Sequence, residues 1–161
     1  ASGVPRWTQL VTMLWALSRA RTGRRETARF RDVETELQDS FAEFCESEIS
    51  PENIDTAATW LSMGHSNWWS TDLRPGATIE PSYVREYNST GGLSPTAVSI
   101  AVDDEACAEV VHDVVSALPY SDGLVRLLEL FLFDDFVEFV DHSDPPMQLS
   151  WPGILNWAFR I

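Results

Sequence analysis

Apolar residues recur through most of this chain at intervals of three and four, the period of a helix that buries one face. This spacing predicts an amphipathic helix over residues 5–21, which Gly23 would end. It predicts a second long helix over residues 25–48, with a narrower apolar stripe. The stripes consist of Trp7, Leu10, Val11, Leu14 and Leu17 in the first helix and of Phe30, Val33, Leu37, Phe41 and Phe44 in the second.

Helix start signals, in which a capping residue precedes proline or acidic residues, predict three more helices. The third helix begins at Ser50-Pro51-Glu52-Asn53 and ends at Gly64. The fourth follows Asp103 and ends at Pro119. A short last helix begins at Ser150.

The most apolar segment of the chain covers residues 124–140. A helix that is apolar on most sides is a buried one, and this helix would be about 25–30 Å long, the width of a small domain. We therefore predict that it forms the centre of a helical bundle. Its charges are confined to Arg126, Glu129, Asp134, Asp135 and Glu138.

Residues 65–95 show no steady period and contain many glycines and prolines, so we predict one long irregular loop there. Within it, Tyr83, Val84 and Tyr87 could form a short helix or strand. The whole pattern predicts an all-α fold: a single helical domain over residues 1–161, with about six helices around the central apolar helix.

The net charge of −14 is unevenly distributed over the 161 residues. Residues 6–31 contain seven of the eleven basic residues, all arginine, and one acid, Glu26, which gives them a charge of +6. The other four basic and 24 acidic residues give the rest −20. Because such a charge repels phosphate, we predict no nucleic-acid partner except through the first two helices. We interpret the basic segment as a solvated helix face beside an acidic body.

Groups that could carry out catalysis do not gather in the sequence. His65, His112 and His142 are far apart, and Cys107 lies about 140° from His112 around their predicted helix, too far for a nucleophile–base pair. We therefore predict no enzymatic activity, no metal and no cofactor. Cys45 and Cys107 are predicted to be buried thiols, with a single disulfide as the alternative.

An acidic cluster at residues 134–144 is the densest group of residues that could bind a cation. Glu138 and His142 lie one helical turn apart and could share one. We interpret the cluster as the solvated end of the central helix, because no second histidine or cysteine lies at ligand spacing.

Tryptophan is abundant near the end of the third helix. Trp60, Trp68 and Trp69 cluster there, and large aromatic side chains dominate both cores and protein-binding sites. We expect at least one ring of the Trp68–Trp69 pair to reach a groove or an interface.

Several short motifs occur in the order found in one family of helical proteins. Phe30-Arg31-Asp32-Val33 looks like the core of that family's third homology motif, and residues 41–53 resemble the helix and turn that follow. Asn67-Trp68 resembles the pair that opens the groove motif, and Trp151 and Trp157 fall near a later tryptophan motif. The chain thus resembles the Bcl-2-like apoptosis regulators, bundles of amphipathic helices around a central apolar helix.

The resemblance implies a divergent or viral protein–protein interaction domain that takes a partner's amphipathic helix in a groove, and hence a role in apoptosis regulation and host–virus interaction. Trp69-Ser70 replaces the family's Gly-Arg, so Arg74 and Arg85 become the candidates to meet a ligand's Asp. The implied partner-binding residues are Leu37, Phe41, Phe44, Trp68, Trp69, Arg74 and Arg85.

Two other functions remain as alternatives. The charge of −20 suits an acidic inhibitor or decoy, of the immunity or anti-defence type, that covers a basic surface. The glycosylation sequon Asn88-Ser89-Thr90 and the two cysteines suit a secreted helical effector. No signal peptide is visible and no apolar run free of charges is long enough to span a membrane, so we expect a cytoplasmic location, with secretion as the alternative.

Overall fold

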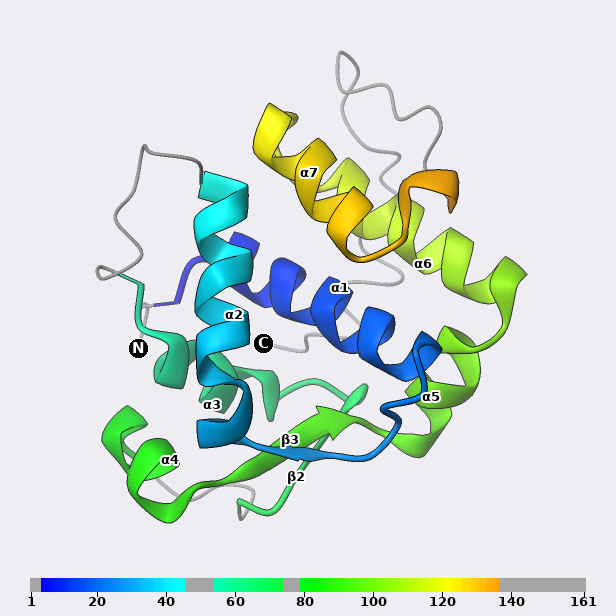
Figure 1. The fold of residues 1–161 in the computed structure, drawn as a ribbon. Helices are drawn as coiled ribbons and strands as arrows, with labels where there is room; N and C mark the ends of the chain where they lie inside the picture. The colour runs from blue at the N-terminus through cyan, green and yellow to red at the C-terminus, as the bar shows by residue number, and fades with distance from the viewer. Residues whose placement is uncertain (1–3, 46–53, 74–78, 137–161) are drawn as a thin grey trace.

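The computed structural model describes residues 4–45, 54–73 and 79–136 (Figure 1). In these ranges the chain is mostly helical and adds one small sheet. The helices are α1 (Arg6–Arg21), α2 (Phe30–Cys45), α3 (Thr56–Met63), α4 (Pro81–Tyr87), α5 (Pro95–Ala101), α6 (Asp104–Ser116), α7 (Asp122–Leu130) and a 3-10 turn, η2 (Asp134–Phe136). The strands are β1 (Ala28–Arg29), β2 (Trp69–Thr71) and β3 (Thr90–Leu93).

Helix α1 forms the centre of the molecule. Every residue from Leu10 to Leu17 is buried, and the helix contacts α2, α3, α5, α6 and β3. In Figure 1 it runs through the middle, with α6 and α7 on one side and α3 and the sheet on the other. Its buried hydroxyls are satisfied within the helix, since Thr12 donates to the Thr8 carbonyl at 2.7 Å.

The predicted central helix over residues 124–140 is wrong. Helix α7 ends at Leu130, and Leu132 turns the chain with a left-handed φ of 64°. The N–H of Phe133 bonds to the Leu128 carbonyl at 2.8 Å and that of Leu132 to the Glu129 carbonyl at 3.1 Å, which closes the helix end. The turn buries Phe131 and Phe133 and leaves Leu130 and Leu132 exposed. The apolar residues of this segment therefore belong partly to a tight turn that packs into the core, and they do not form one continuous buried helix.

Helices α2 and α7 pack with their backbones in close contact. A Cβ at Gly123 would lie 2.4 Å from the Phe44 carbonyl oxygen, so the first turn of α7 needs a residue without a side chain. Ser121 caps the helix by accepting the Leu124 N–H at 3.0 Å. Together these two residues fix where α7 begins against α2.

The predicted irregular loop over residues 65–95 contains ordered elements, so the all-α prediction is corrected to a mostly helical fold. Strands β2 and β3 and helix α4 all fall within it, and the sheet is antiparallel with the order β1-β3-β2. Ala28 pairs with Gly91, and Trp69 pairs with Leu93. Strands of two to four residues are too short to show an alternating pattern in the sequence.

Glycine in β3 makes room for the aromatic core beneath the sheet. A Cβ at Gly91 would lie 2.7 Å from the Trp60 ring. That ring packs against Trp69 at 5.3 Å, Phe30 at 5.5 Å and Trp15 at 6.1 Å between centroids. The sheet is thereby held against α1 and α3.

Some helix boundaries in the structure differ from the predicted ones, and other predicted boundaries fall on residues that the structure does not describe. Asp55, rather than Ser50, caps α3 by accepting the Ala58 N–H at 3.0 Å. Helix α5 was not predicted, although Ser94 followed by Pro95 is a helix start signal of the same kind. The short element predicted around Tyr83, Val84 and Tyr87 is the helix α4.

The predicted last helix from Ser150, residues 137–140, Trp151, Trp157, and the proposed pair Glu138 and His142 lie outside the described residues. No helix within the described ranges has the length and apolar character needed to cross a bilayer. Cys45 and Cys107 are not joined by a disulfide, and burial raises the pKa of the Cys107 thiol.

Candidate functional site

Six of the eleven arginines lie in residues 19–31, here called the arginine segment. It comprises the last turn of α1, the following turn, β1 and the start of α2, and it runs beside β3 (Figure 1). Gly23 ends α1 with a φ of 99°, and the Arg24 N–H bonds to the Arg19 carbonyl at 2.8 Å. The left-handed glycine turns the chain sharply and leaves Arg24 and Arg25 exposed on the surface.

Three of these arginines are bound to the ends of other helices. Arg31 donates to the Arg85 and Glu86 carbonyls at 2.8 and 3.0 Å, at the C-terminus of α4. Arg29 donates to the Asn88 carbonyl at 3.2 Å, just beyond that end. Arg21 donates to the Ala101 carbonyl at 2.9 Å, at the end of α5, and pairs with Asp104 at 2.7 Å. Guanidinium groups stabilise the negative ends of helices in this way.

Arg24 and Arg25 are held much more loosely. Arg24 makes one ion pair, to Glu36, at 3.8 Å, and Arg25 donates one long hydrogen bond to the Ala20 carbonyl at 3.4 Å. Both distances exceed those of a strong charged hydrogen bond. These two guanidinium groups are therefore the cations of the segment most available to an incoming anion.

A small hollow of about 10 Å³ opens between the arginine segment and the β3–α5 region. Its size suits one water-sized group. Arg19, Arg24 and Arg25 contribute to its wall, and the side chains of Leu93 and Val98 contribute apolar surface. The hollow thus combines cations with a small apolar depression.

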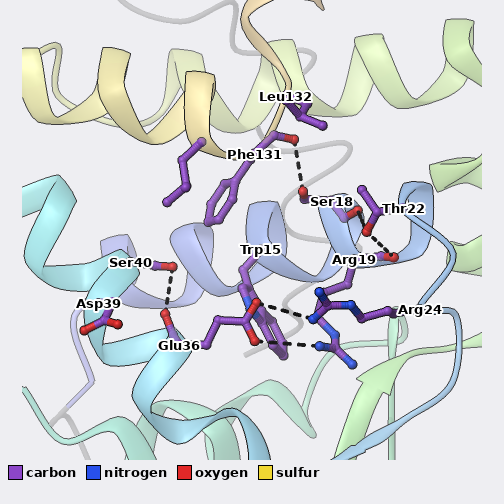
Figure 2. Close-up of a pocket in the computed structure, with 11 residues that line it drawn as sticks. Trp15, Ser18, Arg19, Thr22, Arg24, Glu36, Asp39, Ser40, Phe131 and Leu132 are labelled. Atoms are coloured by element: carbon purple, nitrogen blue, oxygen red, sulfur yellow. Dashed lines mark hydrogen bonds and ion pairs between the residues drawn. The ribbon is translucent and has the colours of Figure 1, made fainter.

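A larger pocket of about 360 Å³ lies on the other side of Arg19 and Arg24, between α1, α2 and the end of α7 (Figure 2). Phe131 points into it from α7, and Trp15 lies opposite (Figure 2). Ser18 donates to the Phe131 carbonyl at 3.0 Å, which fixes the α7 end to α1. Trp15 lines both the pocket and the hollow, and its Nε1 has no acceptor among the described residues.

Glu36 governs the charge between the two cavities. Its two carboxylate oxygens each lie 3.8 Å from a guanidinium nitrogen, one of Arg19 and one of Arg24 (Figure 2). Burial lowers the pKa of Arg19 and Glu36 raises it, yet arginine keeps its charge in proteins. The Arg19 guanidinium also lies 5.0 Å above the Trp15 ring, a cation–π contact. Arg19 is thus a fixed cation, whereas Arg24 has freedom to change partners.

Five of the residues predicted to line a groove are buried in the core. Leu37, Phe41, Phe44, Trp68 and Trp69 are all at most 8% exposed. The spacing that suggested a binding stripe is that of a helix face packed on the core: Phe41 and Phe44 contact the Trp7 ring at 5.8 and 5.2 Å.

Of the two predicted arginines, Arg85 alone lies within the described residues. Arg85 is exposed, but it pairs with Glu34 and lies 5.6 Å above the Phe30 ring. The position of Arg74 lies outside the described residues. The sequence interpretation missed Arg24 and Arg25 as site residues, although their excess of charge was visible.

A family model described as "ScoMcrA-like, DNA sulfur-binding domain" matches residues 1–129 of the chain. No curated protein and no solved structure matches it. The matched residues include the whole arginine segment and both strands that flank β3.

The family match contradicts the resemblance to Bcl-2-like regulators and the functions drawn from it: groove binding, apoptosis regulation and host–virus interaction. It also overturns the alternatives of an acidic decoy and a secreted effector. The motifs that suggested the resemblance, Phe30-Arg31-Asp32-Val33 and Asn67-Trp68, are short, and their apolar residues serve the core.

The prediction of no nucleic-acid partner is wrong as well, since the matched family binds DNA. That prediction gave the −20 of the rest of the chain more weight than the +6 of residues 6–31, which it interpreted as a solvated helix face. Solvent-exposed charges are screened beyond about 8–10 Å, so the surface that touches the ligand decides the sign of the interaction. The arginine segment is a local surface of this kind, with six basic residues and one acid, Glu26.

Proposed function

Because the chain belongs to the family of ScoMcrA-like DNA sulfur-binding domains, we propose that it binds sulfur-modified DNA through the arginine segment and the small hollow beside it. The family match carries the proposal, and the concentration of six arginines in residues 19–31 supports this surface. We take the sulfur to replace a non-bridging phosphate oxygen, as in a phosphorothioate.

A phosphorothioate asks two things of a binding site. It keeps the negative charge of a phosphate, so it needs a cation, preferably the planar donor fork of arginine. Its sulfur is larger, softer and more weakly hydrated than oxygen, so it gains from contact with apolar surface. A receptor must therefore place arginine beside a small apolar depression.

The small hollow meets both requirements. It has room for about one atom, its wall includes Leu93 and Val98, and Arg24 and Arg25 are at its edge. One carboxylate, Glu26, lines the hollow beside three arginines, whereas two, Glu36 and Asp39, line the larger pocket beside two arginines, so the larger pocket repels an anion more strongly. We assign the sulfur to the hollow and the neighbouring phosphate oxygens to Arg24 and Arg25.

The proposal is tested by fluorescence anisotropy with a labelled duplex that carries one phosphorothioate linkage, compared with the same duplex unmodified. The native chain should bind the modified duplex more tightly. Arg25→Ala should weaken binding to both duplexes about tenfold, the loss of one hydrogen bond between charged groups.

A second variant isolates the contribution of sulfur. Val98→Phe should fill the hollow and reduce the preference for the modified duplex, with little effect on the unmodified one. Arg126→Ala is the matched control, since Arg126 lies on α7 and pairs with Glu43. Equal affinity of the native chain for both duplexes would refute the proposal.

We propose further that this domain recognises DNA without catalysing a reaction on it and needs no cofactor for binding, as expected from the sequence. The cytoplasmic location expected from the sequence agrees with a DNA partner. Incubation of the protein with modified plasmid and a divalent cation, followed by gel analysis for nicks, tests the first point.

A further inference from the structure

We propose that the larger pocket receives one nucleobase displaced from the stack of the bound DNA, and that it favours a base with an exocyclic amino group. The inference rests on the proposed function and adds a base-recognition site to it. Its occupant is part of the same duplex that the arginine segment binds.

The larger pocket lies directly beside the small hollow. The pocket and the small hollow share Trp15, Arg19 and Arg24 as lining residues, so they open on either side of the same two guanidinium groups. A DNA strand with a phosphate at Arg24 therefore passes the mouth of the pocket. Figure 2 shows Arg19 and Arg24 together at one edge of the pocket, beside Trp15.

The size and lining of the larger pocket suit one base. A volume of about 360 Å³ lies at the lower end of the range for small-molecule sites, enough for one planar base. Phe131 and Trp15 line the space from opposite sides (Figure 2), but both rings are largely buried and the Arg19 guanidinium lies 5.0 Å above Trp15, so the planar surface offered to a base is the guanidinium itself. The pocket is thus suited to a flat, partly apolar ring.

Two exposed leucines form an apolar rim on the larger pocket. Leu130 and Leu132 both line the pocket and are 61% and 66% exposed. Leu132 also has the left-handed φ of 64°, a conformation that suits glycine better than leucine and that occurs more often at functional sites. Leucines of this kind enter base steps in other DNA-binding proteins and unstack them. The rim would occupy the space that the displaced base leaves.

The acidic side chains select the ligand. Glu36 and Asp39 line the pocket and would repel a phosphate, but a carboxylate accepts hydrogen bonds from the amino groups of cytosine and adenine. Asp39 is exposed and has no ion pair within the described part of the chain, so it can serve as the acceptor. Thymine has no exocyclic amino group and should be disfavoured about tenfold.

The experiment uses the full chain and phosphorothioate duplexes with 2-aminopurine at each nucleotide that flanks the sulfur on either strand. Anisotropy measures binding, and 2-aminopurine fluorescence, which rises when the base leaves the stack, measures displacement. We expect a rise at one position with the native chain. Asp39→Trp should block the pocket and abolish the rise, while His112→Trp, on the exposed side of α6, should retain it.

Base preference gives an independent measurement. At the responsive position, duplexes with adenine or cytosine should bind about tenfold more tightly than the duplex with thymine, and Asp39→Ala should remove the difference. Sulfur-dependent binding without any fluorescence rise, or a rise that persists in Asp39→Trp, would overturn the base site and leave the pocket to another ligand, such as a protein. Absence of sulfur-dependent binding would overturn the proposed function and this inference together.

Discussion

Arginine has two distinct roles within a dozen residues of this protein. Arg21 and Arg31 donate to backbone carbonyls at the ends of α5 and α4 and so hold helices in place. Within the part of the chain that the structure describes, Arg24 and Arg25 have only long contacts and remain available. The amino-acid sequence could show the excess of charge but not this division, because the division depends on which helix ends lie within reach after folding.

Burial of a carboxyl group on α6 makes stability depend on pH. Burial raises the pKa of Asp113 above its ordinary value of 3.8, Glu109 raises it further, and His112 opposes the shift. Between 3.8 and the raised pKa, the native state holds a proton that the unfolded state has released. Stability should therefore be highest below this window and fall as the pH rises through it.

Asp113→Asn should remove that decline and raise the unfolding temperature at pH 7. Thermal unfolding from pH 3 to pH 7 measures both effects, with Glu129→Gln on the exposed surface of α7 as the control. If the variant and the native chain lose stability in parallel over this pH range, Asp113 is not the cause.

At the scale of elements, the sequence predicted helices better than their places in the fold. The helix predicted over residues 5–21 agrees with α1, whereas the one predicted over residues 25–48 begins too early, since α2 starts at Phe30 after the strand β1. The centre was assigned to residues 124–140 because they are the most apolar, yet α1 is the buried helix. Threonines 8 and 12 make α1 look amphipathic, although their hydroxyls tolerate burial because they donate to the carbonyls of Pro5, at the helix cap, and of Thr8.

The strands lay beyond prediction for a related reason. β3 includes Gly91 and Gly92, which disfavour strands by propensity and are typical of loops. Their place in a strand follows from tertiary contacts, because Trp60 and Thr27 occupy the space where side chains would be. The candidate site depends on these contacts, so a pattern confined to neighbouring residues could not reveal it.

The contact between α2 and α7 gives a prediction at this scale. In Gly123→Ala the new methyl group would meet the Phe44 and Glu43 carbonyl oxygens at 2.4 and 2.6 Å, and neither backbone atom can rotate away. We expect a loss of about 1–3 kcal/mol in the free energy of unfolding, the usual effect of overpacking.

Urea unfolding measures this loss, and Gly64→Ala is the matched control. Gly64 has a helical φ of −62°, and its added Cβ would lie 3.3 Å from the nearest atom, so only a small change is expected. A Gly123→Ala protein as stable as the control would show that α7 can move away from α2 at little cost.

For the whole molecule, a net charge of −14 coexists with a surface suited to an anion. The acidic remainder limits unspecific attraction to DNA, whose strength depends on the number of phosphates neutralised. Under the proposed function, binding then relies on a few contacts in the arginine segment. An acidic protein with a local basic surface can thus be selective because most of its exterior repels the same polymer.

The salt dependence of binding should reflect those few contacts and not the net charge. If Arg24 and Arg25 each neutralise one phosphate, the logarithm of the association constant should fall with the logarithm of salt concentration with a slope of about −2. The double variant Arg24→Ala/Arg25→Ala should reduce the slope by about that amount. Anisotropy titrations between low and physiological salt measure it, and a slope near zero for the native chain would contradict the proposal.

The continuous burial of α1 has a consequence for how recognition evolves. The same helix forms the centre of the hydrophobic core and ends in the residues that would contact DNA. Because a shift of this helix would disrupt the core, its position should stay the same in every homologue that folds. New sequence preferences must then arise from exchanges on the short turn after Ala20 and around the mouths of the two cavities. Single substitutions at these surface positions can then change which DNA is bound while the position of α1 stays the same.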